Sequence, residues 1–201
     1  IERHENGRNF KIYKTMIKHI TYLILIILIS SCNQNPIDKW QNYDESDEIK
    51  TNSNLENKRL QFKRIQSISN DKNKLINGFE KEISDFIDSE YELVKALVYE
   101  KSIPEIQQNI IDGKLTYYKL SLFYLSRIYL IEFDQETYLN SIISINKNIL
   151  KEAKRKDKIK NTNIYSLYGI PILLKDNIGF EGLPTTAGAH SLKNNFTDDA
   201  S

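Results

Sequence analysis

The stretch of sequence that decides the fold is Tyr168–Gly188, which reads YGIPILLKDNIGFEGLPTTAG. Its first half contains Ile170, Ile172, Leu173 and Leu174, a continuous apolar run that is typical of a short, fully buried β-strand. The turn-forming residues of DNIG follow, and they are expected to end the strand.

Lys175 lies between the apolar run and the turn, which is an unusual place for a charged residue. An ammonium held against apolar walls loses hydration, and this lowers the pKa of a lysine and makes its neutral amine available as a base. A lysine can thereby replace histidine in acid/base catalysis. The sequence therefore predicts Lys175 as a candidate general base.

The same stretch resembles the amidase signature hydrolases, which use a serine, a second serine in a cis peptide and a lysine. The residues that carry the resemblance are GIP at 169–171, LLKDN at 173–177 and GLPTTAG at 182–188. In that family the lysine of the KDN step is catalytic, so the resemblance implies Lys175 as the catalytic base. It also implies an α/β fold with a mixed sheet covered by helices, a small amide substrate, and no metal or organic cofactor.

The segment with the two catalytic serines lies well downstream of this block in the family, and nothing up to Ser201 matches its GGSSG-like run. We therefore expect residues 103–201 to be the N-terminal part of an amidase domain. We also expect the 201-residue chain by itself to release no ammonia from amides.

Composition argues against several other classes of function. The 28 basic and 27 acidic residues leave a net charge of +1, which gives no support to a nucleic-acid partner. Cys32 is the only cysteine, so an intrachain disulfide and a Cys-rich metal site are excluded. A Ser-His-Asp triad would rely on His190, for which a polar loop position is the simpler interpretation. The sequence shows no P-loop, dinucleotide fingerprint, zincin motif or nucleophile elbow.

A signal segment is predicted at residues 16–32. Met16 is followed by a short positive region, a mostly apolar run over 20–29, and then SSC. This order is typical of a secretory signal, and the run is shorter than the about 20 apolar residues of a membrane span. We expect residues 1–15 to come from translation upstream of the true start.

The residues before Cys32 also resemble the lipobox of bacterial lipoproteins, with ISSC at 29–32 as the match. The resemblance implies a lipidated Cys32 and a protein exported to the bacterial cell envelope and anchored to a membrane. The alternative is that Cys32 is a free thiol behind an uncleaved anchor.

The next two segments are expected to differ in character. Residues 33–70 are polar and read as a linker, in which Trp40 is an isolated aromatic. Residues 71–102 read as a helical extension, because apolar residues recur at helical spacing. Ser89 and Glu92 form a capping-box pattern ahead of a second short helix there.

Within residues 103–201, a helix is predicted from Pro104 to Gly113, and Thr116 is expected to cap the next helix. Leu139–Ile145 is a candidate strand, and Asn148–Lys160 is a candidate basic helix whose lysines are expected to face solvent. This order of elements is also similar to the start of amidase signature domains.

Three functions remain open at this point. The first is an envelope amidase that works through a Ser-cisSer-Lys mechanism. The second is the amidase-like component of an aminoacyl-tRNA amidotransferase, which supplies ammonia for aminoacyl-tRNA and against which the predicted export signal argues. The third is a non-catalytic envelope lipoprotein that retains an amidase scaffold.

Overall fold

The computed structural model describes residues 37–63, 71–159 and 161–196, all of which belong to one compact unit that starts at Ile37. The predicted upstream segment and signal segment, with Cys32, lie outside the described residues. The linker and domain boundaries proposed from the sequence stay predictions.

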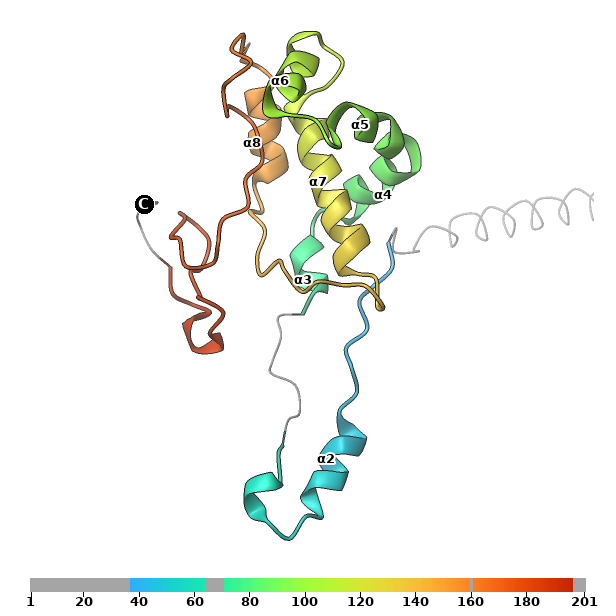
Figure 1. Ribbon diagram of the computed structural model, residues 1–201, viewed down its shortest axis with the longest axis vertical. Coiled ribbons are helices and arrows are strands. Elements are labelled where there is room, and N and C mark those ends of the chain that lie inside the picture. The colour runs from blue at the N-terminus through green and yellow to red at the C-terminus, as the bar shows by residue number, and fades with distance from the viewer. Residues whose placement is uncertain (1–36, 64–70, 160, 197–201) are drawn as a thin grey trace, which may run out of the picture. The chain divides into compact units, whose positions relative to one another are not determined.

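The described residues form helices joined by turns and extended loops (Figure 1). In chain order the elements are α2 (Ser46–Ser53), η1 (Lys58–Leu60), α3 (Asn73–Ile76), α4 (Glu80–Ser89), α5 (Tyr91–Val98), α6 (Ile103–Ile111), α7 (Tyr117–Glu132), α8 (Ile149–Lys156) and η2 (His190–Leu192). No residue of α2 is buried, whereas α3 to α8 each contribute buried side chains.

Helix α7 is the centre of the helical part, and α4, α5 and α8 pack against it (Figure 1). Its residues Leu120 and Phe123 are fully buried in the hydrophobic core. Tyr124, which the sequence places on the same face, is instead exposed. The core takes α7 on several sides, so the buried face of α7 is broader than a single stripe of apolar residues.

The start of α7 is capped twice. Thr116 accepts a hydrogen bond from the backbone N–H of Lys119 at 3.1 Å, as predicted. The carboxylate of Asp157, just after α8, accepts the N–H groups of Tyr117 at 2.7 Å and Tyr118 at 3.1 Å. These groups have no partner inside the helix, so the long-range cap ties the end of α8 to the start of α7.

The predicted limits of α6 are confirmed to within two residues. The helix begins at Ile103 with Pro104 in its first turn, and Gly113 follows its end at a φ of 73°. The backbone N–H and the hydroxyl of Ser102 both donate to the Glu105 carboxylate, at 2.8 and 2.6 Å. These two residues form a capping box at the start of α6.

The capping box predicted at Ser89 and Glu92 is wrong. Ser89 is the last residue of α4, and its hydroxyl donates to the carbonyl of Asp85 at 2.5 Å. Glu90 precedes α5 without a side-chain cap. The basic helix is also shorter than the predicted 148–160, because α8 covers only Ile149–Lys156.

The strand predicted at Leu139–Ile145 is absent. Asn140 has a φ of 52°, which is incompatible with a strand, and its N–H donates to the Glu132 carboxylate at 2.9 Å. The N–H of Ser141 donates to the same carboxylate at 2.7 Å. A side chain thus takes the backbone donors that a strand ladder would use.

The strand predicted over 170–174 is also absent, and the mixed sheet is not seen among the described residues. There the β-type pairing consists of two isolated bridges, Phe180 with Leu183 and Pro184 with Phe196. Residues 170–174 are extended but pair with none of the described segments, and Pro171 has no N–H to contribute. An extended segment becomes a strand only through such pairing.

Candidate functional site

Lys175 lies on an exposed turn that follows the apolar run. Its carbonyl accepts the N–H of Ile178 at 2.9 Å, which closes the turn. Ile172 and Leu173, expected to be buried, are 63% and 76% exposed. The predicted shielding of Lys175 from water is therefore not provided by the residues that the structure describes.

Asp176, the next residue, binds the loop that contains TTAG. Its Oδ1 accepts the N–H of Thr186 at 3.0 Å, and its Oδ2 accepts the hydroxyl of Thr186 and the N–H of Gly188, the latter at 3.1 Å. Its backbone carbonyl accepts the N–H of Ala187 at 2.9 Å. The KDN and TTAG parts of the sequence are thus joined directly through Asp176.

These hydrogen bonds determine the charge state of Asp176. Partial burial by itself would raise the pKa of this carboxyl group, but the donors of Thr186 and Gly188 outweigh burial and lower the pKa. Asp176 is therefore an ionised acceptor at neutral pH.

The two threonines of this loop have different surroundings. Thr186 is buried, and its hydroxyl donates to Asp176. The hydroxyl of Thr185 is also shielded but has no hydrogen-bond partner among the described residues. The backbone of Thr185 pairs with Asn195, since its N–H donates to the Asn195 carbonyl at 2.8 Å and its carbonyl accepts the Asn195 amide at 2.9 Å. The hydroxyl of Thr186 thus closes the loop onto Asp176.

A buried polar network anchors the start of the block to α6 and α7. The side-chain amide of Gln107 donates to the carbonyls of Ser166 and Tyr168, at 2.7 and 2.9 Å. The hydroxyl of Tyr117 donates to the Gln107 oxygen at 2.9 Å, and burial raises the pKa of Tyr117. Each group is satisfied, which makes this network a structural anchor.

Gly169 fits against this network because it has no side chain. A Cβ atom there would lie 2.3 Å from Cδ1 of Tyr117, and the glycine has a φ of +74°. The position thus requires glycine for two reasons, close packing and backbone conformation. The GIP part of the block therefore has a packing role in this structure.

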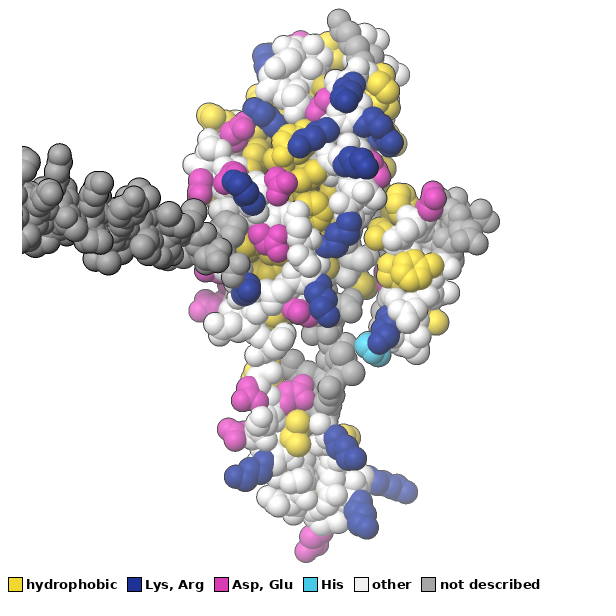
Figure 2. Space-filling view, turned by 180° about the vertical axis from the view of Figure 1, so that it is seen from behind, with side chains coloured by type: hydrophobic (Ala, Val, Ile, Leu, Met, Phe, Trp, Pro, Cys, Tyr) yellow, Lys and Arg dark blue, Asp and Glu magenta, His cyan; other side chains and the backbone are white. Residues whose placement is uncertain are grey.

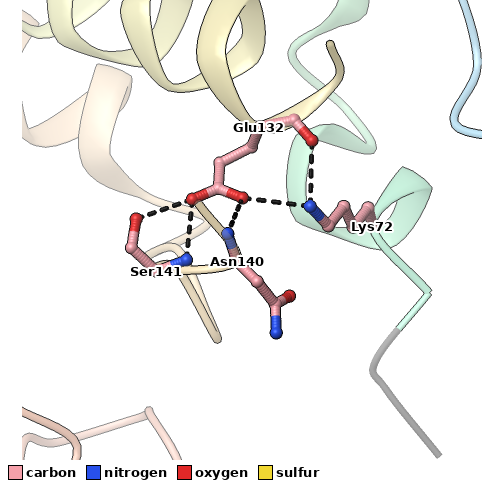
Figure 3. Close-up of polar contacts among 4 residues, drawn as sticks. All are labelled: Lys72, Glu132, Asn140 and Ser141. Carbon is pink, nitrogen blue, oxygen red and sulfur yellow. Dashed lines mark hydrogen bonds and ion pairs between the residues drawn. The ribbon is translucent and has the colours of Figure 1, made fainter. Parts of the chain in front are cut away.

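A second polar cluster is formed by Lys72, Glu132, Asn140 and Ser141 (Figure 3). The Glu132 carboxylate accepts from Lys72 at 3.1 Å and from the hydroxyl of Ser141 at 2.6 Å. Lys72 also donates to the Glu132 carbonyl at 3.0 Å. All the partners come from the chain itself, so the cluster fixes the fold and leaves no free group for catalysis.

Aromatic side chains cover the other side of Lys72. Its ammonium lies 4.3 Å from the ring centroid of Trp40 and 3.9 Å from that of Tyr138. The backbone of Trp40 is bound to the Asn73 side chain through hydrogen bonds of 2.9 and 3.1 Å. Trp40, isolated in the sequence, is thus packed on the helical part.

Two lysines of the basic helix lie over aromatic rings. The ammonium of Lys154 is 4.5 Å from the ring centroid of Tyr118, and that of Lys156 is 4.3 Å from that of Tyr168. Figure 2 shows acidic and basic side chains interspersed over the face it displays. The basic cluster of the sequence thus contributes in part to packing.

Other predicted sites have no structural support in the described part of the chain. His190 is exposed at the start of η2. No group of three or more His, Cys, Asp and Glu side chains that could hold a metal ion occurs within residues 37–63, 71–159 and 161–196. Over the same ranges, no helix has the length and apolar character that crossing a membrane requires.

The geometry of the KDN and TTAG segments agrees with a comparison of the sequence with protein families. Residues 123–201 match the Amidase family. This amidase-like region includes Lys175, Asp176 and the TTAG loop, together with most of α7. The sequence resemblance to amidases is therefore supported over this region.

The curated relatives share the same region. They are the amidase-like components, named with the letter A, of glutamyl-tRNA(Gln) amidotransferases. The relative from Thermoanaerobacter pseudethanolicus is 32% identical over 99 residues, which are 48% of this chain and 20% of the relative. The relative from Pediococcus pentosaceus is 35% identical over 99 residues, 48% of this chain and 19% of the relative. The chloroplastic/mitochondrial relative from Arabidopsis thaliana is 32% identical over 89 residues, 43% of this chain and 16% of the relative. The chain thus covers at most a fifth of the length of these proteins.

A solved structure has a similar fold. The crystal structure of an amidase family protein from Bacillus anthracis str. Ames aligns with a TM-score of 0.55 and 30% identity, over 68% of this chain and 27% of the other. The described helices and the loops that follow them are therefore similar in arrangement to part of an amidase family protein.

Proposed function

We propose that this chain is part of an amidase that hydrolyses a carboxamide through an acyl-serine intermediate, with Lys175 as the base. The observation that carries the proposal is the direct link between the turn at Lys175 and the TTAG loop, within the region that matches the Amidase family. Both parts of the matched motif thus meet at one place in the fold.

The proposed chemistry moves one proton back and forth. A serine oxygen attacks the amide carbon, and the serine proton passes through a second serine to the neutral amine of Lys175. The C–N bond then breaks as this proton returns to the leaving nitrogen. Water adds to the acyl-serine ester in the same manner and releases the acid. No residue of this sequence is assigned as either serine.

The environment of Lys175 sets a requirement on the proposal. A lysine acts as a base only in its neutral form, which removal from water favours. Lys175 and residues 172–174 are exposed in this structure. In the active protein, an additional surface has to cover this apolar stretch, which Figure 1 shows as part of the loop near the C-terminal end of the described chain.

We also propose that the protein is a lipoprotein of the bacterial cell envelope, lipidated at Cys32. The support is the order of positive, apolar and small residues at 16–32. Mass spectrometry of the protein extracted from membranes tests the proposal. A mature N-terminus at Cys32 that carries acyl chains is expected, and an unmodified N-terminus upstream of Cys32 would contradict it.

A second candidate function is favoured by the names of the relatives. They are components of glutamyl-tRNA(Gln) amidotransferases, and they match up to 48% of this chain. In this alternative the amidase-like chemistry would release ammonia for the amidation of glutamyl-tRNA(Gln). A non-catalytic lipoprotein with an amidase scaffold is the third candidate.

The experiment that separates these candidates uses the full-length gene product and a panel of simple amides, including acetamide, benzamide and glutamine. The envelope amidase is expected to release ammonia without tRNA and to form a covalent acyl adduct at a serine, detected by mass spectrometry. Ammonia release from glutamine that requires glutamyl-tRNA(Gln) would favour the amidotransferase component. No release under either condition would favour the non-catalytic scaffold.

A further inference from the structure

We infer that Asp176 is a positioning residue that holds the backbone of Lys175 in place by binding the loop Thr186–Gly188. The inference rests on the proposed function of Lys175 as a base. It assigns to Asp176 a role different from proton transfer and makes Thr186 a second member of the same device.

The hydrogen bonds around Asp176 are directed at the peptide unit that links it to Lys175. Ala187 donates to the Asp176 carbonyl at 2.9 Å, and Ile178 donates to the Lys175 carbonyl at 2.9 Å. The backbone is therefore fixed at two successive carbonyl groups. A base has to lie within hydrogen-bond distance of its proton donor, so this constraint acts on the one coordinate that proton transfer needs.

The loop that binds Asp176 depends on the carboxylate for its own conformation. Ala187 has a φ of 47° and Gly188 a φ of 75°, so two consecutive residues lie in the left-handed region. Such a conformation is unfavourable for alanine and persists only where surrounding contacts hold it. Here these contacts include the hydrogen bonds from Thr186 and Gly188 to the Asp176 carboxylate.

The arrangement also shows why Asp176 is not itself the base. Both of its oxygens already accept hydrogen bonds from the loop, and its side chain makes no ion pair with a lysine among the described residues. An asparagine would replace one acceptor oxygen by an NH₂ group facing the loop donors. The carboxylate therefore cannot be replaced by a neutral amide of the same shape without losing a contact.

Thr185 and Thr186 provide a matched pair for testing this device. They are adjacent, have the same side chain and both have shielded hydroxyls, but only Thr186 has a hydrogen bond from its hydroxyl to Asp176. Replacement by valine removes the hydroxyl and keeps the shape. Thr186→Val should thus release the loop from Asp176, and Thr185→Val should not.

The experiment compares Asp176→Asn, Thr186→Val, Thr186→Ser and Thr185→Val in the full-length gene product. The first readout is the rate at which the amine of Lys175 reacts with trinitrobenzenesulfonate, measured by peptide mass spectrometry relative to exposed Lys193. This readout needs no enzyme activity. The second readout is kcat and KM for ammonia release from whichever amide the wild-type protein hydrolyses.

Asp176→Asn and Thr186→Val are expected to change the labelling rate of Lys175 at least severalfold. They are also expected to lower kcat by about tenfold to a hundredfold with little change in KM, as displacement of a catalytic group does. Thr185→Val should match the wild-type protein, and Thr186→Ser should restore most of the loss. Unchanged labelling of Lys175 in Asp176→Asn and Thr186→Val would overturn the inference, whether or not the protein is active.

The two proposals fail in distinguishable ways. A wild-type protein that releases no ammonia, with Lys175 labelling altered by Asp176→Asn, would overturn the proposed function and support the positioning of Lys175. A wild-type protein that is active, with kcat unaffected by Asp176→Asn, would overturn the positioning role alone.

Discussion

The ammonium of Lys72 lies 3.1 Å from Oε2 of Glu132, and the two side chains are only 7% and 2% exposed. Lys72 precedes α3 and Glu132 is the last residue of α7, so this ion pair joins segments that are 60 residues apart. Removing one partner of a buried ion pair leaves a charge without compensation, which is far more costly than losing an exposed pair.

Glu132→Ala should lower the free energy of unfolding by about 3–5 kcal/mol. Urea denaturation of the chain measures this change. The control is Glu92→Ala, because Glu92 pairs with Lys95 at 3.2 Å on the surface and an exposed pair contributes about 0–1 kcal/mol. Equal losses in the two variants would contradict the assigned importance of the buried pair.

The same carboxylate should make the stability depend on pH. Burial by itself would raise the pKa of Glu132, but hydrogen bonds from Ser141 and Lys72 outweigh it, so the pKa is lowered from 4.5. The stability from ionised Glu132 is therefore complete above that value and is lost as the pH falls through the lower pKa of the folded state. Urea denaturation at pH 7, 5, 4 and 3 should show this loss, and Glu132→Gln should reduce its size.

Trp40 should report directly on the packing of the segment that precedes α2. It is the only tryptophan of the sequence, and its backbone is held by the Asn73 side chain. In Asn73→Ala its fluorescence should shift to longer wavelength and become more accessible to acrylamide. Asn77→Ala, a nearby asparagine whose side chain has no such role, is the control. Identical quenching in all three proteins would show that the Trp40 segment does not depend on this contact.

Gly169 and Gly182 allow backbone strain to be separated from steric clash. Both have positive φ, +74° and +78°, but a Cβ at Gly169 would meet the ring of Tyr117 whereas one at Gly182 has no described atom within 4 Å. Each change to alanine should cost about 1–2 kcal/mol for the left-handed backbone. Gly169→Ala should cost an additional ~1–3 kcal/mol for overpacking. Urea denaturation of both variants measures the difference, and equal costs would argue against the close contact with Tyr117.

Local features of the fold could be predicted from the sequence. The start of α7 depends on Thr116, and the limits of α6 on Pro104 and Gly113, all of which act within a few residues of their own position. The sequence also predicts a turn directly after Lys175, and the structure has one there. These predictions succeed because capping and turn formation depend mainly on the neighbouring residues.

The contacts that join distant segments could not be predicted. Nothing in the local sequence pairs Lys72 with Glu132, although Glu132 continues the buried side of α7, which is a signal for a carboxylate with a buried partner. The predictions of the two strands are wrong for a related reason, since strand formation depends on a partner that periodicity does not identify. The sequence predicts Asp176 only as a strand-breaking residue, and its binding of Thr186 and Gly188 depends on a loop ten residues further along the chain.

The most direct test of the proposed function is the rate of ammonia release by the full-length protein with Lys175→Ala. Lys193→Ala is the matched control, since Lys193 is an exposed lysine of the same region outside the KDN step. Lys175→Ala is expected to abolish turnover while circular dichroism stays unchanged, and Lys193→Ala is expected to retain the wild-type rate. Undiminished ammonia release by Lys175→Ala would contradict the assignment of Lys175 as the catalytic base.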